Sequence, residues 1–266
     1  MKRLLCILLL LALSLCLCGC GGSAYEVQTV TTMVEQDYSL AFRTGDPTAY
    51  YVAAAIEKLN AQGLVDELSS KWFGSRIVTF GKNADALAGL EPSQPRDFIV
   101  GVDVNSFPMA YITEGQYWGF DIELAMAVCE ELNWNLKVQS IEKENVYIEL
   151  SSGNIDCAWG GIALNPQEVI EGKIAQYGPY MHNDIVIAKR GDAFIENKYM
   201  LANKALAMCS TTEAMEALQA DPGIVNRLGQ ISRLAGGTTE CFLYLRQGRC
   251  DVILTDTAAI YYFNCH

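Results

Sequence analysis

The stretch VDELSSKWFG, residues 65–74, predicts a short helix that carries an aromatic pair and stops at a glycine. Leu64, Leu68 and Trp72 recur at helical spacing, and Gly74 is a typical residue after a helix end. A helix with this ending is typical of the close of a domain, yet most of the chain follows it. The order of the segments around residues 65–74 therefore decides how this protein folds.

The residues before this stretch predict a strand and then a helix. Residues 38–43, YSLAFR, are typical of a strand. Asp46 and Pro47 then form an N-cap followed by a first-turn proline, and apolar residues recur at helical spacing from Val52 to Leu59. Residues 81–96 lose this periodicity and predict a linker.

After the linker the pattern alternates between strands and helices. Buried strands are predicted at 98–103, 136–140, 155–161, 184–191, 205–209 and 251–256. Helical patterns lie between most of them, including one over 144–151. Such alternation predicts an α/β fold with mostly parallel sheets covered on both faces.

The N-terminus predicts an exported lipoprotein. Lys2 and Arg3 precede an apolar run from Leu4 to Leu17, which is too short to span a bilayer comfortably and is typical of a signal peptide. The run ends in LCGC, a pattern typical of lipoprotein cleavage before Cys20, which would then carry lipid. The alternative is that these cysteines only decorate an apolar segment.

The composition argues against several classes of function. The sequence holds 19 Lys and Arg against 31 Asp and Glu, a formal net charge of −12, which would become −14 after loss of Lys2 and Arg3. Such a surface repels phosphate, so nucleic acid is not an expected partner. Six cysteines follow Cys20 without a C-x-x-C pair, and the histidines are His182 and His266, so no metal or cofactor is expected. We expect most of these cysteines to pack as small apolar side chains, although an oxidising location would permit disulfides whose pairing the sequence does not fix.

Four segments share signature sequences with a known family: GVDVNSFPMAYITEGQYWGFDIELAMAV (101–128), SSGNIDCAWGGIALNPQEV (151–169), QYGPY (176–180) and QGRCDVILTDTAAIYY (247–262). Together they resemble the type II periplasmic solute-binding proteins of polar amino-acid ABC transporters, the bacterial extracellular solute-binding proteins of family 3. The resemblance implies a two-lobed periplasmic-binding-protein-like II fold, with a ligand held between the lobes.

The order of the segments departs from that family. There, the last motif is followed by a crossing strand, a segment like "ygiafrkGDp", a helix and a close like "eKWFG". Here YSLAFRTGDP lies at 38–47 and SKWFG at 70–74. The resemblance therefore implies a circularly permuted domain, which is tolerated because domain termini are often close. A truncated tandem array that completes itself by swapping with a neighbour remains the alternative.

The expected division has six parts: a lipoprotein signal peptide over 1–19, a lipid-anchored linker over 20–24, a permuted segment over 25–80 that supplies a crossing strand and part of lobe 1, a linker over 81–96, lobe 1 over 97–187 and lobe 2 over 188–266.

The resemblance also implies residues that hold a ligand. Asp256 occupies the position of the family's ammonium-binding aspartate; the alternative is a plain helix N-cap. Thr211 and Thr212 match a Gly-Thr-Thr segment at a helix start, where backbone N–H groups favour an anionic oxygen. A capping box from Ser210 to Glu213 explains the same residues equally well.

Four further residues on the larger lobe are candidates for the ligand site. Asp103 closes the strand at 98–103 and matches a position that meets cationic side chains in relatives; the alternative is a carboxylate that caps its own loop. Phe107, Met109 and Trp159 are candidate apolar walls, with packing in the core as the alternative.

The second signature departs from the family. Where relatives carry "S-x-S/T-x-T-x-x-R", this chain has GGIALNPQE, so Gly161 and Ala163 replace hydroxyls and Glu168 replaces the arginine that would grip a ligand carboxylate. Either Glu168 points away, or the ligand lacks a carboxylate there. Asp103, Glu168 and Asp256 together would favour a cationic or amine-bearing ligand, or an unusual amino acid.

Three classes of function remain open. The first is a monomeric receptor, held by lipid at the extracytoplasmic face of the cell membrane, that hands a small amino-acid-like or amine-bearing solute to an ABC transporter permease. The second is a degenerate sensor or non-transport lipoprotein on the same fold. The third, an enzyme of the dehydratase type found on this fold, is the weakest because the sequence offers no visible nucleophile–base pair. We therefore expect a binding protein rather than an enzyme.

Overall fold

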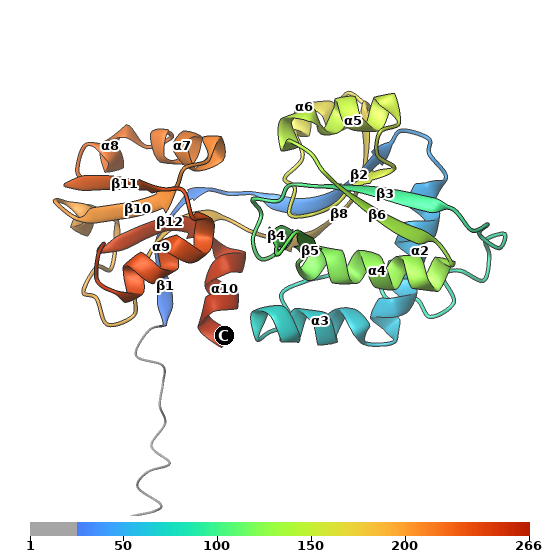
Figure 1. Cartoon of the computed structure of the whole chain (residues 1–266), viewed down its shortest axis with the longest axis horizontal. Coiled ribbons are helices and arrows are strands. Elements are labelled where there is room, and N and C mark those ends of the chain that lie inside the picture. Colours follow the sequence, from blue (N-terminus) through green and yellow to red (C-terminus); the bar gives the residue numbers. More distant parts are fainter. Residues whose placement is uncertain (1–25) are drawn as a thin grey trace, which may run out of the picture.

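The computed structural model describes residues 26–266, which fold into two α/β lobes that lie side by side (Figure 1). Each lobe is built on a five-stranded sheet, so the prediction of a two-lobed α/β fold is confirmed. The predicted signal peptide, Cys20 and the linker after it lie outside the described residues. Within the described part, no helix is long and apolar enough to cross a membrane.

The larger lobe is organised around a sheet with the strand order β6-β3-β7-β2-β8. Its strands are β2 (Asp37–Arg43), β3 (Asp97–Val102), β6 (Asn135–Ser140), β7 (Cys157–Ala158) and β8 (Ile174–His182). Helices α2 (Thr48–Ala61), α3 (Leu64–Phe73) and α4 (Phe120–Leu132) cover one face; α5 (Val146–Ser152) and α6 (Pro166–Ile170) lie on the other (Figure 1). Each face has its own apolar core, as expected for a sheet buried on both sides.

The smaller lobe is organised around a sheet with the order β1-β9-β12-β10-β11. Its strands are β1 (Val27–Val34), β9 (Ile185–Arg190), β10 (Ala205–Cys209), β11 (Gln230–Leu234) and β12 (Val252–Asp256). Helices α7 (Thr212–Gln219) and α8 (Pro222–Val225) lie on one side, and α9 (Gly237–Arg246) and α10 (Thr257–Cys265) on the other (Figure 1). The remaining elements are a hairpin of β4 (Tyr111–Thr113) and β5 (Gln116–Trp118), and the short 3-10 helices η1 (Lys143–Asn145) and η2 (Lys198–Leu201).

In each sheet, four of the five strands run in one direction and one strand runs against them. The reversed strand is β2 in the larger lobe and β9 in the smaller lobe. Both follow directly from a strand in the other lobe, because β1 leads into β2 and β8 leads into β9. The chain therefore crosses between the lobes twice, and the early residues supply one strand to each sheet.

The two crossings are hydrogen-bonded to each other. The backbone N–H of Asn183 donates to the carbonyl of Gln36 at 2.9 Å. The side-chain Oδ1 of Asn183 accepts from Ala258 N at 2.7 Å and from Thr257 Oγ1 at 3.0 Å, at the start of α10. Asn183 is fully buried, and its hydrogen bonds tie the two crossings to each other and to the start of α10.

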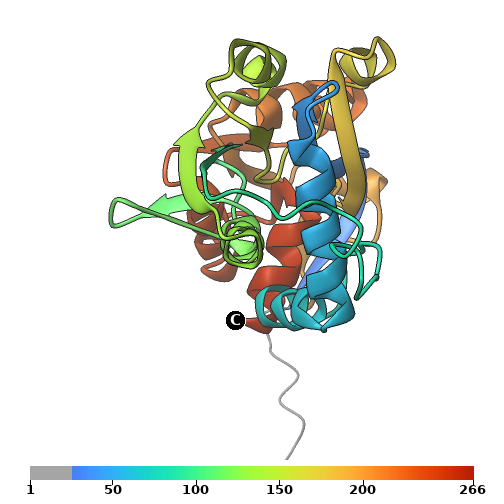
Figure 2. The same cartoon turned by 90° about the vertical axis from the view of Figure 1, so that its right-hand side faces the viewer.

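A second contact between the lobes joins the early segment to the last helix. Helix α10 packs against α3, and Figure 2 shows the two helices side by side. Trp72 and Tyr262 have ring centroids 5.9 Å apart, and Cys265 Sγ lies 3.7 Å from the carbonyl of Trp72. The aromatic pair of the SKWFG segment therefore packs partly against the C-terminal end of the chain.

Two local predictions are wrong in their boundaries. The strand predicted over 155–161 is only Cys157–Ala158, because the backbone turns away at Gly161, whose φ of +65° suits glycine. The capping box predicted from Ser210 is also wrong: Thr211 is the N-cap of α7 and accepts from Ala214 N at 3.3 Å.

Candidate functional site

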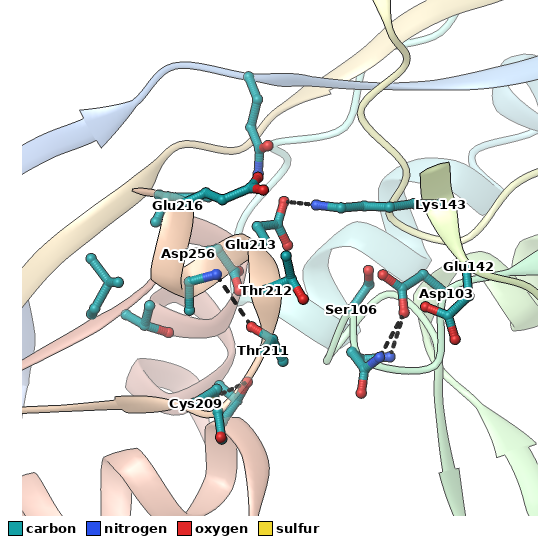
Figure 3. A pocket seen from close by; sticks show the side chains of 18 of the residues that line it. Asp103, Ser106, Glu142, Lys143, Cys209, Thr211, Thr212, Glu213, Glu216 and Asp256 are labelled. Atoms are coloured by element: carbon teal, nitrogen blue, oxygen red, sulfur yellow. Dashed lines mark hydrogen bonds and ion pairs between the residues drawn. The ribbon is translucent and has the colours of Figure 1, made fainter. Parts of the chain in front are cut away.

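A cavity of about 460 Å³ lies between the two lobes, beside the crossings (Figure 3). Its walls come from both lobes, and Gln36 and Tyr38 of the first crossing also line it. Tyr38 is almost fully buried. Burial raises the pKa of its phenol well above the usual value, so this hydroxyl stays protonated.

The wall on the larger lobe is built at strand ends. Asp103 follows β3, and Glu142, Lys143 and Glu144 follow the neighbouring parallel strand β6. The carboxyl ends of parallel strands meet at one edge of a sheet, so these side chains gather there. Asp103 Oδ1 accepts from the backbone N–H of Asn105 at 2.9 Å. Asp103 thus both lines the cavity and caps its own loop, and the two alternatives drawn from the sequence are compatible.

The wall on the smaller lobe is built the same way. Cys209 ends β10 and Asp256 ends the parallel strand β12, while Thr211 and Thr212 begin α7. Asp256 is the N-cap of α10 and accepts from Ala259 N at 2.9 Å. Figure 3 places these side chains opposite those of the larger lobe. The two alternatives drawn from the sequence for Asp256, a helix N-cap or a residue of the ligand site, are therefore also compatible, since Asp256 caps a helix and faces the cavity.

Negative charge dominates the cavity. Among the described residues, a single lysine lines the cavity. The described carboxylates that line it number six: Asp103, Glu142, Glu144, Glu213, Glu216 and Asp256. That lysine, Lys143, pairs with Glu213 across the cavity, so it joins the two lobes (Figure 3). Five carboxylates remain without this counter-charge, and the site is therefore suited to a positively charged ligand.

Neighbouring groups shift the pKa of Asp256, and a buried hydroxyl beside it lacks a hydrogen-bond partner in the described part of the chain. Burial raises the pKa of Asp256 to about 6, the hydrogen bond from Ala259 N lowers it, and the nearby Glu213 raises it further. Beside it, the buried Thr255 Oγ1 lines the cavity and has no hydrogen-bond partner among the described residues. A ligand that brings an ammonium and a hydrogen-bonding group would satisfy both side chains.

Trp159 and Gly161 lie beneath the cavity rather than along it. Trp159 is fully buried, and its Nε1 donates to Asp121 Oδ1 at 3.0 Å. Gly161 N donates to Asp121 Oδ2 at 2.8 Å, and Tyr180 OH donates to the same oxygen at 2.7 Å. Met109 is likewise buried in the core. The aromatic ring of Trp159 is turned inward because this carboxylate holds its indole N–H.

Ala163 and Glu168 line a second, smaller cavity of about 250 Å³. This cavity borders the first one, since Lys143 and Glu144 line both. Glu168 lies in α6 and therefore does not gather with Asp103 and Asp256.

Phe107 belongs to the contact between the lobes. Its ring centroid lies 5.0 Å from that of Tyr111, 4.8 Å from that of Tyr262 and 5.5 Å from that of Phe263. Two of these partners belong to α10, so Phe107 packs across the lobe boundary, outside the set of residues that line the main cavity.

Sequence reasoning missed most of the acidic residues of the cavity. Glu142 and Glu144 follow a predicted strand, and an acidic pair at a strand end was the available signal. Glu213 was assigned to a capping box, and Glu216 carried no pattern at all. Their convergence depends on how the two lobes face each other, which no local pattern encodes.

Comparison with known proteins gives one family match and several similar solved structures. Residues 98–224 match the family model of the bacterial extracellular solute-binding proteins, family 3. A polar amino acid ABC uptake transporter substrate-binding protein from Streptococcus thermophilus is 26% identical, with a TM-score of 0.46; the match covers 60% of this chain and 61% of that protein.

Two further solved structures are similar. An ABC uptake transporter substrate-binding protein from Streptococcus pneumoniae with bound histidine is 26% identical, with a TM-score of 0.48 and coverage of 63% of this chain and 68% of that one. An ancestral cationic amino acid solute-binding protein, AncCDT-1, is 24% identical, with a TM-score of 0.53 and coverage of 63% and 72%. Residues 98–224, just under half of this chain, are therefore similar in sequence to the bacterial extracellular solute-binding proteins, family 3.

Proposed function

We propose that this chain is the solute-binding component of an ABC transporter and captures a small cationic or amine-bearing solute between its lobes. The observation that carries the proposal is the cavity between the lobes, which six carboxylates line, including Asp256 at the end of a strand. The family description supports solute binding in general. The excess of carboxylates supports the cationic class, because a buried ammonium needs charged or well-aimed partners.

Capture would work by closure of the lobes. The two crossings are tied together at Asn183, where the pivot would lie, and the Lys143–Glu213 pair already joins the lobes across the cavity. A solute that contacts both walls binds the closed arrangement more tightly than an open one, and this difference in affinity drives closure. The permease would then recognise the closed form.

The replacement of the family's arginine by Glu168 restricts the chemical classes of solute that the protein would bind. Glu168 lines the second cavity, so it neither grips a carboxylate in the main cavity nor repels one there directly. A carboxylate on the solute would instead meet the backbone N–H groups at the start of α7, near Thr211 and Thr212. Diamines and basic amino acids fit this charge distribution better than acidic ones.

Isothermal titration calorimetry of the purified protein tests the proposal. The panel is lysine, arginine, histidine, putrescine, glutamate and aspartate, each at low ionic strength. We expect a saturable signal for at least one cationic compound and none for glutamate or aspartate. Tight binding of glutamate, or silence across the panel, contradicts the cationic proposal; silence would favour the degenerate sensor.

We also propose that the protein binds without chemical turnover. The family description supports a binding role. The test is proton NMR of any bound compound after prolonged incubation with the protein. Recovery of unchanged compound is expected, whereas a stoichiometric excess of product over protein would establish an enzyme.

We propose further that the domain is circularly permuted, with residues 25–80 supplying its family-typical C-terminal part. Three observations support this proposal: β1 and β2 insert into the two sheets, α3 packs against α10, and the AncCDT-1 match covers 63% of the chain, about the share that follows residue 96. Light scattering after gel filtration should give a monomer. An obligate dimer would favour the swapped alternative.

The lipid anchor at Cys20 remains a prediction from the sequence. Metabolic labelling with an alkyne-tagged fatty acid should modify the full chain at the extracytoplasmic face of the membrane. The Cys20→Ala variant should lose the label and leave the membrane fraction. A variant that is still labelled would contradict the predicted site.

A further inference from the structure

Two cysteines of the smaller lobe meet at the wall of the cavity. Cys209 Sγ and Cys241 Sγ lie 3.7 Å apart, although 32 positions separate them in the sequence. Cys209 ends β10 and lines the cavity, while Cys241 lies in α9 and is fully buried. The fold thus brings one accessible and one inaccessible thiol into van der Waals contact.

The geometry distinguishes this pair from the other cysteines. A disulfide bond is about 2.05 Å long, so the two sulfurs need to close by roughly 1.7 Å, which is within the range of side-chain rotation. Cys129, Cys157, Cys250 and Cys265 form no sulfur–sulfur hydrogen bond in the part of the chain that the structure describes. Cys209 and Cys241 are therefore the pair of thiols within hydrogen-bonding distance of each other among the described residues.

The two thiols have different reactivities. The hydrogen bond with Cys241 lowers the pKa of Cys209, and the hydroxyl of Thr238, whose Oγ1 lies 3.7 Å from Cys209 Sγ, lowers it further against the effect of burial. The same hydrogen bond and burial raise the pKa of Cys241. Because the thiolate is the reactive form, Cys209 is the better nucleophile, and it is also the sulfur that faces the cavity.

We propose that Cys209 and Cys241 form a redox-active dithiol that closes to an intramolecular disulfide when a small external disulfide enters the cavity. The thiolate of Cys209 attacks one sulfur of that external disulfide and releases the first small thiol, which takes up the proton of Cys209. Cys241 then gives up its proton and attacks Cys209 Sγ, which releases the second small thiol. The protein loses two protons and two electrons, and the external disulfide is reduced to two thiols.

This modification would act on the cavity wall itself. Cys209 leads directly through Ser210 into Thr211 and Thr212 at the start of α7. A covalent bond to α9 would tie this turn to the helix behind it and draw Cys209 Sγ away from the cavity. The proposal concerns the thiols alone and holds whatever solute the cavity takes.

The first test uses the purified full-length protein, reduced, freed of reductant and exposed to oxidised glutathione. Mass spectrometry of unreduced peptides should identify a crosslink between the peptides that contain Cys209 and Cys241. A crosslink of Cys241 to Cys250, or retention of both thiols after prolonged exposure, would overturn the proposal.

Variants separate the two steps. Cys241→Ala should stop at a glutathione adduct on Cys209, whereas Cys209→Ala should leave Cys241 unmodified. Cys250→Ala is the matched control, because it removes another buried thiol of the same lobe and should still give the crosslink. An adduct on Cys241 in the Cys209→Ala variant would show that the assigned order of attack is wrong.

Thiol labelling of the protein without substitutions gives a test that does not depend on whether a variant folds. A brief pulse of N-ethylmaleimide on the native reduced protein should label Cys209 well before Cys241. Faster labelling of Cys241 would contradict the proposal. Oxidised glutathione given first should protect both cysteines from a later pulse in denaturant, and a reductant should restore labelling.

Discussion

Asp121, beneath the cavity in the larger lobe, and Asp256, in the wall of the smaller lobe, differ in how fully they are hydrogen-bonded. Asp121 is 1% exposed and receives three hydrogen bonds, from Trp159 Nε1, Gly161 N and Tyr180 OH. Asp256 accepts from Ala259 N and otherwise faces the cavity. Burial raises the pKa of both, to about 7 and about 6 respectively.

This difference separates a structural carboxylate from one that is available to a ligand. The three donors around Asp121 stabilise its ionised form, hold the turn at Gly161 and occupy three of its roughly four acceptor sites, and its burial keeps it out of reach of a solute. Asp256 keeps most of its hydrogen-bonding capacity, and a cation in the cavity would complete it. Access to the cavity and free acceptor capacity together therefore distinguish Asp256 from Asp121.

The largest expected effect comes from Asp121→Asn. An asparagine turns one N–H₂ group toward donors and leaves at least one buried donor unsatisfied, which costs about 3 kcal/mol of unfolding free energy. For a protein of this size we expect the melting temperature to fall by roughly 10 °C. Differential scanning calorimetry measures the melting temperature, and an unchanged value would show that Asp121 does not stabilise the fold.

The matched substitution Asp256→Asn should leave the stability nearly unchanged and reduce the affinity for the solute. Asparagine is as good an N-cap as aspartate, so the melting temperature of the free protein should hardly change. Affinity for the cationic compound found by calorimetry should fall on the order of 100-fold, because a charge-assisted hydrogen bond is lost. Equal binding by the variant would place the ammonium elsewhere in the cavity.

Acid should weaken binding through the same residue. A bound cation prefers ionised Asp256, whose pKa in the free protein is raised to about 6. Protonation of Asp256 therefore competes with binding as pH falls through that value, and affinity should drop about tenfold between pH 7 and pH 5. Titrations in the Asp256→Asn variant are the control and should show a much flatter profile over this window.

The smallest effect is expected from Glu168→Gln. Glu168 lines the second cavity, whereas Asp256 lines the main one. Loss of the Glu168 charge, which lies outside the main cavity, should change the affinity for the solute by less than about threefold, as for screened surface charges. A loss comparable to that of Asp256→Asn would mean that the two cavities act as one site.

Much of the architecture could be predicted from the sequence. The alternation of strands and helices predicted the α/β class, and Asp103 and Asp256, predicted at strand ends, both line the cavity between the lobes. Phe107 and Trp159 were harder to predict, since an aromatic near a strand end serves equally well as a cavity wall or as core. Asp121 decides the case of Trp159 by binding its indole N–H, and α10 decides that of Phe107 by packing against it.

The sequence by itself determined the elements, their order along the chain and the acidic character of the protein, because these follow from local periodicity and composition. Only the tertiary structure decided which charges share a cavity, since Glu142, Glu144, Glu213 and Glu216 come together across the gap between two lobes. It also paired Cys209 with Cys241, which lie on different elements. Such meetings depend on packing between distant segments, and no pattern within a single segment records them.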